Sequence, residues 1–186
     1  MSRLYVIAGM IGAAALSRTL PHPPNFAPMN AMALFAGAYL ADKKAFAIIV
    51  PLLAMLFSDT LLQALTGWGF HADMWIVYGA IAFITTLGFR LNESHTGKQR
   101  STAKLIGFSV FASVLFFVVT NAIPFALHGM YGMYPRTWDG FIACFVAAIP
   151  FFQNSLLGDL VFTTVLFGGF EIAQRTVPSL RTETTA

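Results

Sequence analysis

Residues 45–66 read AFAIIVPLLAMLFSDTLLQALT, and this stretch decides the fold. Asp59 is its only charged residue. Its length suits a helix that crosses a bilayer, which takes about 20 predominantly apolar residues. Residues 73–91 and 104–127 are comparably long and apolar. The sequence therefore predicts an all-α, polytopic membrane protein.

The composition of the chain agrees with this prediction. Of 186 residues, 57% are hydrophobic and 10% are charged, whereas about a quarter are charged in a soluble domain. The net charge of +3 comes from basic residues spread over several loops, which argues against a nucleic-acid partner. The single cysteine, Cys144, excludes an internal disulfide and a CxxC motif.

Two shorter apolar segments near the N-terminus are predicted to bring the bundle toward six crossings. Residues 4–16 and 29–41 are short for a crossing, so they must lean on neighbours, extend into their flanks or enter the membrane only partly as a hairpin. Residues 1–178 are predicted to form one transmembrane domain. Residues 179–186 are small and polar, and are predicted to be a disordered cytoplasmic tail.

The last apolar stretch, residues 140–173, is too long for one plain crossing. Pro150 lies within it, and proline usually kinks or ends a helix. We therefore expect an extra half-helix at 140–152 on the outer surface, followed by the sixth crossing at 154–173. A single kinked helix is the alternative.

The loop charges predict the orientation of a six-helix bundle. One side receives nine basic residues and the other only two, and basic residues favour the cytoplasmic side of a bacterial inner membrane. Both termini are therefore expected in the cytoplasm. The nine are Arg3, Lys43, Lys44, Arg90, Lys98, Arg100, Lys104, Arg175 and Arg181, and the two are Arg18 and Arg136.

In this orientation, polar side chains concentrate in the outer half of the bundle. Carboxylates in membrane helices normally face protein or water and have a partner, and Arg18 is the strong cation placed to pair with Asp59 or Asp159. We expect these groups to surround an outward pocket, although amides can also simply join helices by hydrogen bonds. The candidate substrate-binding residues are Arg18, Asn25, Asn30, Asp59, Gln63, Asn121, Trp138, Asn154 and Asp159.

Metal and enzyme motifs give weaker signals. His22, His71 and His128 fall on the outer side, but each lies in a different loop without HxxH spacing, so they are weak candidates for metal ligands. No cofactor is expected. The chain has no GxSxG or HExxH motif, which argues against an enzyme, and no Walker A motif.

Small residues recur at helical spacing in the first apolar segment. Ala8 and Gly12, and Gly9 and Ala13, form small-xxx-small pairs that let helices approach closely in lipid. They predict either internal packing or a face that docks another membrane subunit.

Three motifs carry a resemblance to a known family. They are Arg18-x-x-Pro-His-Pro-Pro-Asn-Phe-x-Pro-x-x-Ala31-x-Ala-Leu-Phe-x-Gly37, Ser58-Asp59 and Ala148-Ile-Pro-Phe-Phe-x-Asn-x-Leu-Leu-Gly-Asp159. With them the chain resembles an uncharacterised bacterial membrane-protein family that is grouped with the S components, the substrate-binding subunits, of energy-coupling factor transporters.

The resemblance implies capture of a vitamin, cofactor precursor or related small molecule from outside the cell. It also implies partners, namely a transmembrane coupling subunit and ATPase subunits, with small residues of the first helix at the contact. The alternatives are a structural or assembly subunit of a larger membrane complex and, less favoured, an intramembrane enzyme.

The charge split predicts the outcome of cysteine labelling. A membrane-impermeant thiol reagent added outside the cell should modify a cysteine placed at position 132 and spare one placed at position 98. The reverse pattern would contradict the predicted orientation.

Overall fold

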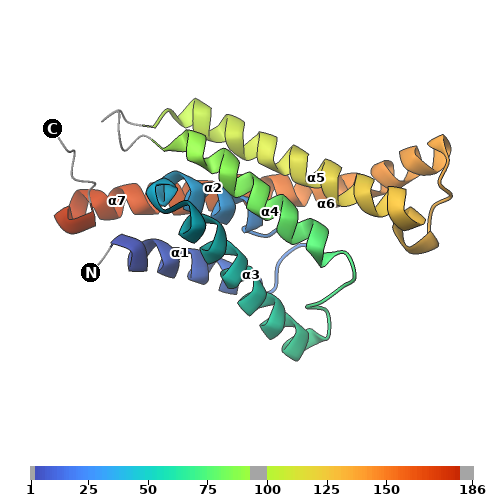
Figure 1. The fold of residues 1–186 in the computed structure, drawn as a ribbon, viewed down its shortest axis with the longest axis horizontal. Coiled ribbons are helices and arrows are strands. Elements are labelled where there is room, and N and C mark those ends of the chain that lie inside the picture. Colours follow the sequence, from blue (N-terminus) through green and yellow to red (C-terminus); the bar gives the residue numbers. More distant parts are fainter. Residues whose placement is uncertain (1–2, 93–99, 181–186) are drawn as a thin grey trace.

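The computed structural model describes residues 3–92 and 100–180, and these residues form helices without a strand (Figure 1). Tight turns of 3-10 type (η1, η2, η4) and π type (η3) link several helices. The elements are α1 (Arg3–Ser17), α2 (Met29–Tyr39), η1 (Ala41–Lys43), α3 (Lys44–Thr66), α4 (Met74–Gly88), η2 (Phe89–Leu91), α5 (Thr102–Gly132), α6 (Trp138–Thr163), η3 (Thr164–Gly168), α7 (Gly169–Thr176) and η4 (Pro178–Leu180).

Four helical runs among the described residues are long and apolar enough to cross a membrane. The prediction of an all-helical fold is therefore confirmed, and four candidate spans agree with a membrane protein, whereas the count of six crossings stays a prediction. α1 is a shorter apolar helix of 15 residues, and α2 has only 11. The four runs are Ala41–Thr66, Met74–Leu91, Thr102–Gly132 and Trp138–Thr176.

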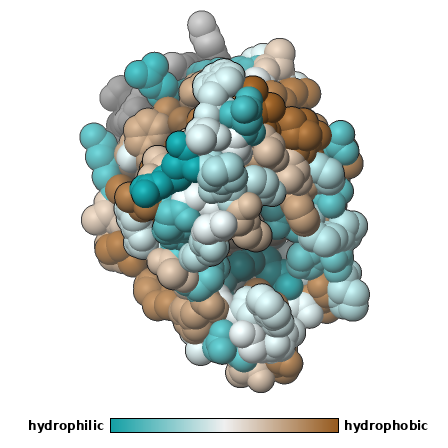
Figure 2. All heavy atoms as spheres, turned by 90° about the vertical axis from the view of Figure 1, so that its right-hand side faces the viewer, coloured by the Kyte–Doolittle hydropathy of each residue, from teal (hydrophilic) through white to brown (hydrophobic). Residues whose placement is uncertain are grey.

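The bundle has two ends, which differ in the chain segments that lie there (Figure 1). The start of α1 and the whole of α7 lie at one end, which we call the terminal end. The connections at 67–73 and 133–137 lie at the opposite end, which we call the loop end. Figure 2 looks onto the loop end, where hydrophilic and hydrophobic patches are mixed and the surface is hollowed near its middle.

The short helix α2 lies at the centre of the bundle. Every residue from Asn30 to Tyr39 is buried, and α2 contacts α1, α3, α4, α5 and α6. A helix that is apolar on all sides has no face for water. At a rise of about 1.5 Å per residue, α2 is about 16 Å long, which is roughly half of the bilayer core.

Small residues bring α2 and α4 into backbone contact. A Cβ added at Gly37 would overlap the carbonyl oxygen of Thr85 and would lie 2.8 Å from the Cα of Gly88. Glycines at both positions let the two helices approach as close as their backbones allow.

An aromatic cluster closes the terminal end of α2. The ring of Tyr39 packs against Phe170 at 4.6 Å between centroids, and Phe35 packs edge-on against Phe167 at 5.3 Å. The guanidinium of Arg100 lies 4.6 Å from the centre of the Tyr39 ring and donates a 2.8 Å hydrogen bond to the Tyr39 hydroxyl. The Arg100 side chain is 7% exposed, so a cation is buried beside the carbonyl end of α2.

The last helical run differs from the predicted break at Pro150. α6 continues through Pro150 to Thr163, and the π turn η3 joins it to α7. The expected separate half-helix at 140–152 is therefore wrong, and the alternative of one helix is confirmed. A proline removes one backbone donor, but membrane helices tolerate it where neighbouring groups restore the lost pairing.

The C-terminal prediction lies partly outside the described residues. Pro178–Leu180 form the turn η4, in which Leu180 is buried, and residues 181–186 are not among those described.

The contact between α2 and α4 gives a stability prediction. Gly37→Ala should lower the free energy of unfolding by about 1–3 kcal/mol, as overpacking a tight core does. Gly79→Ala, on α4 where an added Cβ meets nothing within 4 Å, is the matched control and should be neutral or stabilising. Thermal unfolding in detergent compares the two. Equal melting temperatures would contradict the close approach.

Candidate functional site

The loop between α1 and α2 is clamped onto α6. The Asn154 side-chain amide donates a 3.0 Å hydrogen bond to the carbonyl oxygen of Pro24. A Cβ added at Gly158 would lie 3.0 Å from the backbone nitrogen of Ala27, so the loop backbone rests directly on the helix. Two sequence motifs that are far apart in the chain therefore form one structural unit.

Asp159 completes this clamp at the start of α2. Its side chain is buried, at 1% exposure, and its Oδ2 accepts hydrogen bonds from Asn30 Nδ2 at 2.7 Å and from the Ser113 hydroxyl at 2.6 Å. The backbone N–H groups of Asn30 and Ala31, in the first turn of α2, also interact with this carboxyl group. Acidic groups favour helix N-termini because unpaired N–H groups are exposed there.

Asp59 forms a second buried cluster, on α3. Its Oδ1 lies 2.7 Å from the Arg18 guanidinium, and its Oδ2 accepts a 2.6 Å hydrogen bond from the Tyr78 hydroxyl. Arg18 also donates to the Ser58 hydroxyl at 2.6 Å. The expected pairing of Arg18 is confirmed for Asp59, and the cluster ties the end of α1 to α3 and α4.

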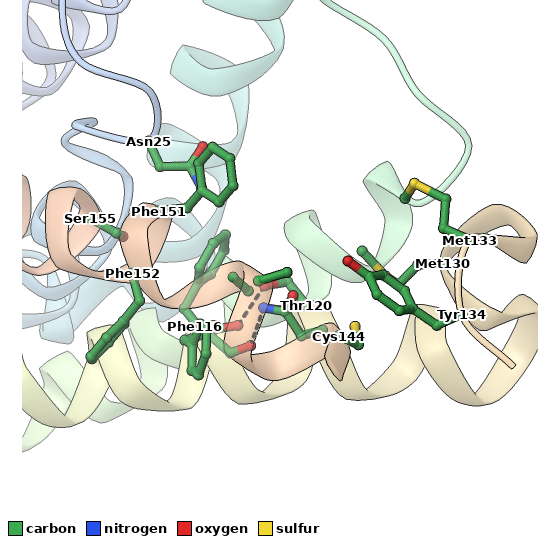
Figure 3. Close-up of a pocket in the computed structure, with 14 residues that line it drawn as sticks. Asn25, Phe116, Thr120, Met130, Met133, Tyr134, Cys144, Phe151, Phe152 and Ser155 are labelled. Carbon is green, nitrogen blue, oxygen red and sulfur yellow. Dashed lines mark hydrogen bonds between the residues drawn. The ribbon is translucent and has the colours of Figure 1, made fainter. Parts of the chain in front are cut away.

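A cavity of about 400 Å³ lies between α5 and α6 (Figure 3), and we call it the α5–α6 cavity. Volumes of about 300–1,000 Å³ are usual for small-molecule sites. Phenylalanine and methionine contribute six of its fourteen lining residues. The lining residues are Asn25, Phe116, Phe117, Thr120, Asn121, Met130, Met133, Tyr134, Cys144, Ala147, Ala148, Phe151, Phe152 and Ser155.

A few uncharged polar groups interrupt this apolar wall. Asn121 donates its amide to the carbonyl oxygen of Phe117 at 2.8 Å, and Thr120 donates its hydroxyl to Phe116 at 2.8 Å; Figure 3 draws both bonds. Each side chain keeps an oxygen that can accept a hydrogen bond. Asn25 brings the loop between α1 and α2 to the same cavity.

Left-handed backbone conformations gather around this cavity. Gly129, Met130 and Tyr131 have φ values of 59°, 51° and 59°, and Asn25 has a φ of 63°. The left-handed conformation costs roughly 1–2 kcal/mol for an ordinary residue. Such strain is often held at ligand-binding segments, and here Met130 and Asn25 both line the cavity.

A second cavity of about 430 Å³ lies between the start of α4 and the end of α5. Beside it, His128 Nε2 lies 3.1 Å from Asp73 Oδ1, and the Tyr131 backbone N–H donates to His128 Nδ1 at 2.8 Å. A neutral ring with its proton on Nε2 satisfies both contacts. The second cavity is lined by His71, Ala72, Asp73, Ile76, Val77, Thr120, Pro124, Met130 and Tyr131.

A comparison of the sequence with protein families gives one match. The family described as "Family of unknown function (DUF6580)" matches residues 1–180. The chain belongs to this family. No curated protein and no solved structure matches it.

In this DUF6580 chain, the predicted substrate-binding residues fall into separate groups. Asn25 and Asn121 line the α5–α6 cavity. Arg18 and Asp59 form one buried cluster. The start of α2 is held to α6 by the bond between Asn30 and Asp159, and the preceding loop is held to α6 by Asn154. The structure thus does not bring all of the predicted residues to one cavity.

Two further predicted site residues shape the loop end. Gln63 Oε1 accepts hydrogen bonds from the backbone N–H groups of Gly69 at 2.9 Å and Phe70 at 3.1 Å, so it orders the connection from α3 to α4. Trp138 is 72% exposed and stacks on Phe141 with ring centroids 5.5 Å apart.

The three outer histidines do not assemble into a metal centre. His22 contacts the carbonyl oxygens of Arg18 and Pro23, whereas His128 contacts Asp73. Within residues 3–92 and 100–180, no group of three or more His, Cys, Asp or Glu side chains could hold a metal ion.

The small residues of α1 lie away from the core. Ile7 and Ile11 are fully buried, at 0% exposure. An added Cβ at Gly9 or Gly12 would meet nothing within 4 Å. Gly9 and Ala13 are exposed, whereas Ala8 and Gly12 are half-buried. We call these four residues the open face of α1, because close internal packing of its glycines is not observed.

The contacts of Asp73 predict that the stability of the turn at residues 129–134 depends on pH. Burial raises the pKa of Asp73, but hydrogen bonds from Tyr131 and His128 outweigh burial, so the net pKa is lowered. Because folding lowers this pKa, the stabilisation is complete above the unfolded value of about 3.9 and is lost as the pH falls through the folded value.

Asp73→Asn should therefore speed amide hydrogen exchange in residues 129–134 at neutral pH. In the unmodified protein this stabilisation should be lost only when the pH falls below about 4. Asp139→Asn, which changes an exposed carboxylate at the same end, is the control and should leave that exchange unchanged. Equal exchange in both variants would show that Asp73 does not hold the turn.

Proposed function

We propose that the protein is a substrate-binding membrane subunit that captures a small molecule from outside the cell, as the S components of energy-coupling factor transporters do. The cavity between α5 and α6 carries this proposal. It has the volume of a small-molecule site, aromatic walls and a few polar groups, which is the usual composition of ligand pockets.

The lining favours an uncharged, flat ligand. The cavity wall contains no Asp, Glu, Lys, Arg or His among the described residues. A charged ligand would lose its hydration there without a counter-charge, which is costly. Aromatic side chains such as Phe116, Phe151 and Tyr134 offer ring faces for stacking, while Asn25 and Asn121 offer hydrogen bonds.

The proposed topology has six crossings and both termini in the cytoplasm of a bacterial inner membrane. The nine-to-two charge split supports it, and so does the position of the start of α1 and of α7 at one end of the bundle. α1 and α2 would then be short crossings, with the loop at 18–28 completing the path through the outer half. The loop end would face outward.

Any ATP-driven uptake would need partner subunits, because the chain has no Walker A motif. We propose that a coupling subunit, itself attached to ATPases, docks on the open face of α1 formed by Ala8, Gly9, Gly12 and Ala13. The room above Gly9 and Gly12 supports this assignment, since close helix contacts in membranes use such residues.

A structural or assembly subunit is the second candidate function. The same open face of α1 favours it, but such a subunit would not need a cavity of about 400 Å³. The two functions differ in whether the isolated protein binds a small molecule.

Mass spectrometry of the protein purified in mild detergent tests the proposal, and a co-purifying small molecule is the expected result. Ala148→Phe adds a ring to the cavity wall and should reduce ligand occupancy at least tenfold, about 1.4 kcal/mol. Ala143→Phe, on an exposed position of α6 outside the cavity, should keep it. A folded protein without ligand, or equal occupancy in both variants, would refute the proposal.

A further inference from the structure

The contact between Asp159 and Asn30 leaves one oxygen atom of each side chain without a hydrogen-bond partner. Three buried side-chain polar atoms lack a hydrogen-bond partner among the described residues, and two of them are Asp159 Oδ1 and Asn30 Oδ1. Both side chains are almost fully buried, at 1% and 2% exposure. The same two side chains are already joined by the 2.7 Å bond from Asn30 Nδ2 to Asp159 Oδ2.

The two unpaired atoms are both acceptors when Asp159 is ionised. A carboxylate has no hydrogen to donate, and the oxygen of an asparagine amide can only accept. A carboxylic acid and an amide, in contrast, can pair through two hydrogen bonds that close a ring. One runs from the amide N–H to the acid carbonyl, and the other from the acid O–H to the amide oxygen. One proton on Asp159 Oδ1 supplies the missing donor.

Within residues 3–92 and 100–180, no cation forms an ion pair with Asp159. The nearest expected candidate, Arg18, is bound to Asp59. The carboxyl group of Asp159 contacts α2 and α5 through the neutral side chains of Asn30 and Ser113. The backbone N–H groups at the start of α2 supply only partial positive charge.

Most other titratable groups on these helices lie near helix ends. α2 carries only Tyr39, at its far end. α5 carries Lys104 near its start and His128 and Tyr131 near its end. α6 carries Asp139 in its first turn and Cys144 in its second. An isolated carboxylate in apolar surroundings is strongly disfavoured.

We propose that Asp159 and Asn30 form a proton-binding site in the core of the bundle. The proton is taken from water, forms a bond with Asp159 Oδ1 and is donated to Asn30 Oδ1, so the pair is neutral and doubly hydrogen-bonded. Release of the proton to water leaves two acceptor oxygens without a donor, one on each side chain. The pair then loses one of its two hydrogen bonds, and the start of α2 is held less firmly.

Infrared spectroscopy of the purified full-length protein at neutral pH tests this assignment directly. We expect the C=O stretching band of a protonated carboxylic acid. The band should disappear in Asp159→Asn and persist in Asp73→Asn, because the net pKa of Asp73 is lowered and its carboxyl is ionised at neutral pH. Absence of the band from the unmodified protein, or its survival in Asp159→Asn, would overturn the proposal.

A second variant keeps the test decisive if Asp159→Asn does not fold. Asn30→Ala removes the acceptor of the acid O–H, so the acid band should shift in frequency, because this frequency responds to hydrogen bonding. A band at an unchanged frequency would rule out the pairing with Asn30.

A bound sodium ion is the competing explanation, and thermal unfolding distinguishes it. At constant ionic strength and pH, replacing choline chloride with sodium chloride should leave the melting temperature of the unmodified protein unchanged. A rise that saturates with sodium and is absent from Asp159→Asn would show a sodium site in place of the proton.

Discussion

The rest of the structure depends on burying the two ends of α2, a helix of only 11 residues at the centre of the bundle. The first N–H groups and last carbonyl groups of any helix lack partners within it, and a bilayer core offers no water to supply them. In α2 the bundle places a polar side chain at each end. The carboxyl group of Asp159 lies at the N–H end, and the guanidinium of Arg100 binds the Tyr39 hydroxyl beside the carbonyl end. The positive charge of Arg100 complements the helix dipole there, and the carboxyl oxygens of Asp159 can accept at the N–H end whether or not the group carries a proton.

Hydropathy alone predicted the class of fold because it reports the environment of each segment directly. The long apolar stretches became α3, α4 and α5, and the loss of water around Asp59 made its pairing with Arg18 foreseeable. The sequence could not decide between a break at Pro150 and one helix that continues through it. Whether a proline ends a membrane helix depends on which neighbours can pair the freed backbone groups, and that information lies in the packing rather than in the local sequence.

The local sequence also does not reveal which side chains of the candidate site face a cavity. The aspartates were predicted to bind substrate because burying an unpaired charge costs free energy. Partners within the protein can offset that cost as well as a ligand would, as the contacts of Asp59 with Arg18 and Tyr78 show. The phenylalanines that line the cavity could not be recognised, because a ring facing a cavity and a ring facing lipid have the same composition signal. The sequence does mark this part of the cavity by Thr120 and Asn121, which are adjacent polar residues within an apolar helix. Of the two, only Asn121 was predicted to bind substrate.

The loop before α2 links the cavity to the centre of the bundle. Asn25 lines the cavity, Pro24 is fastened to Asn154, and Asn30 is bonded to Asp159. Prolines restrict the backbone between these points, so the loop has few ways to absorb a displacement at one end without moving the other. A ligand that contacts Asn25 and a proton that binds Asp159 would therefore act on the same segment. In that case each would change the affinity of the protein for the other by the same factor, because coupling between two binding equilibria is reciprocal.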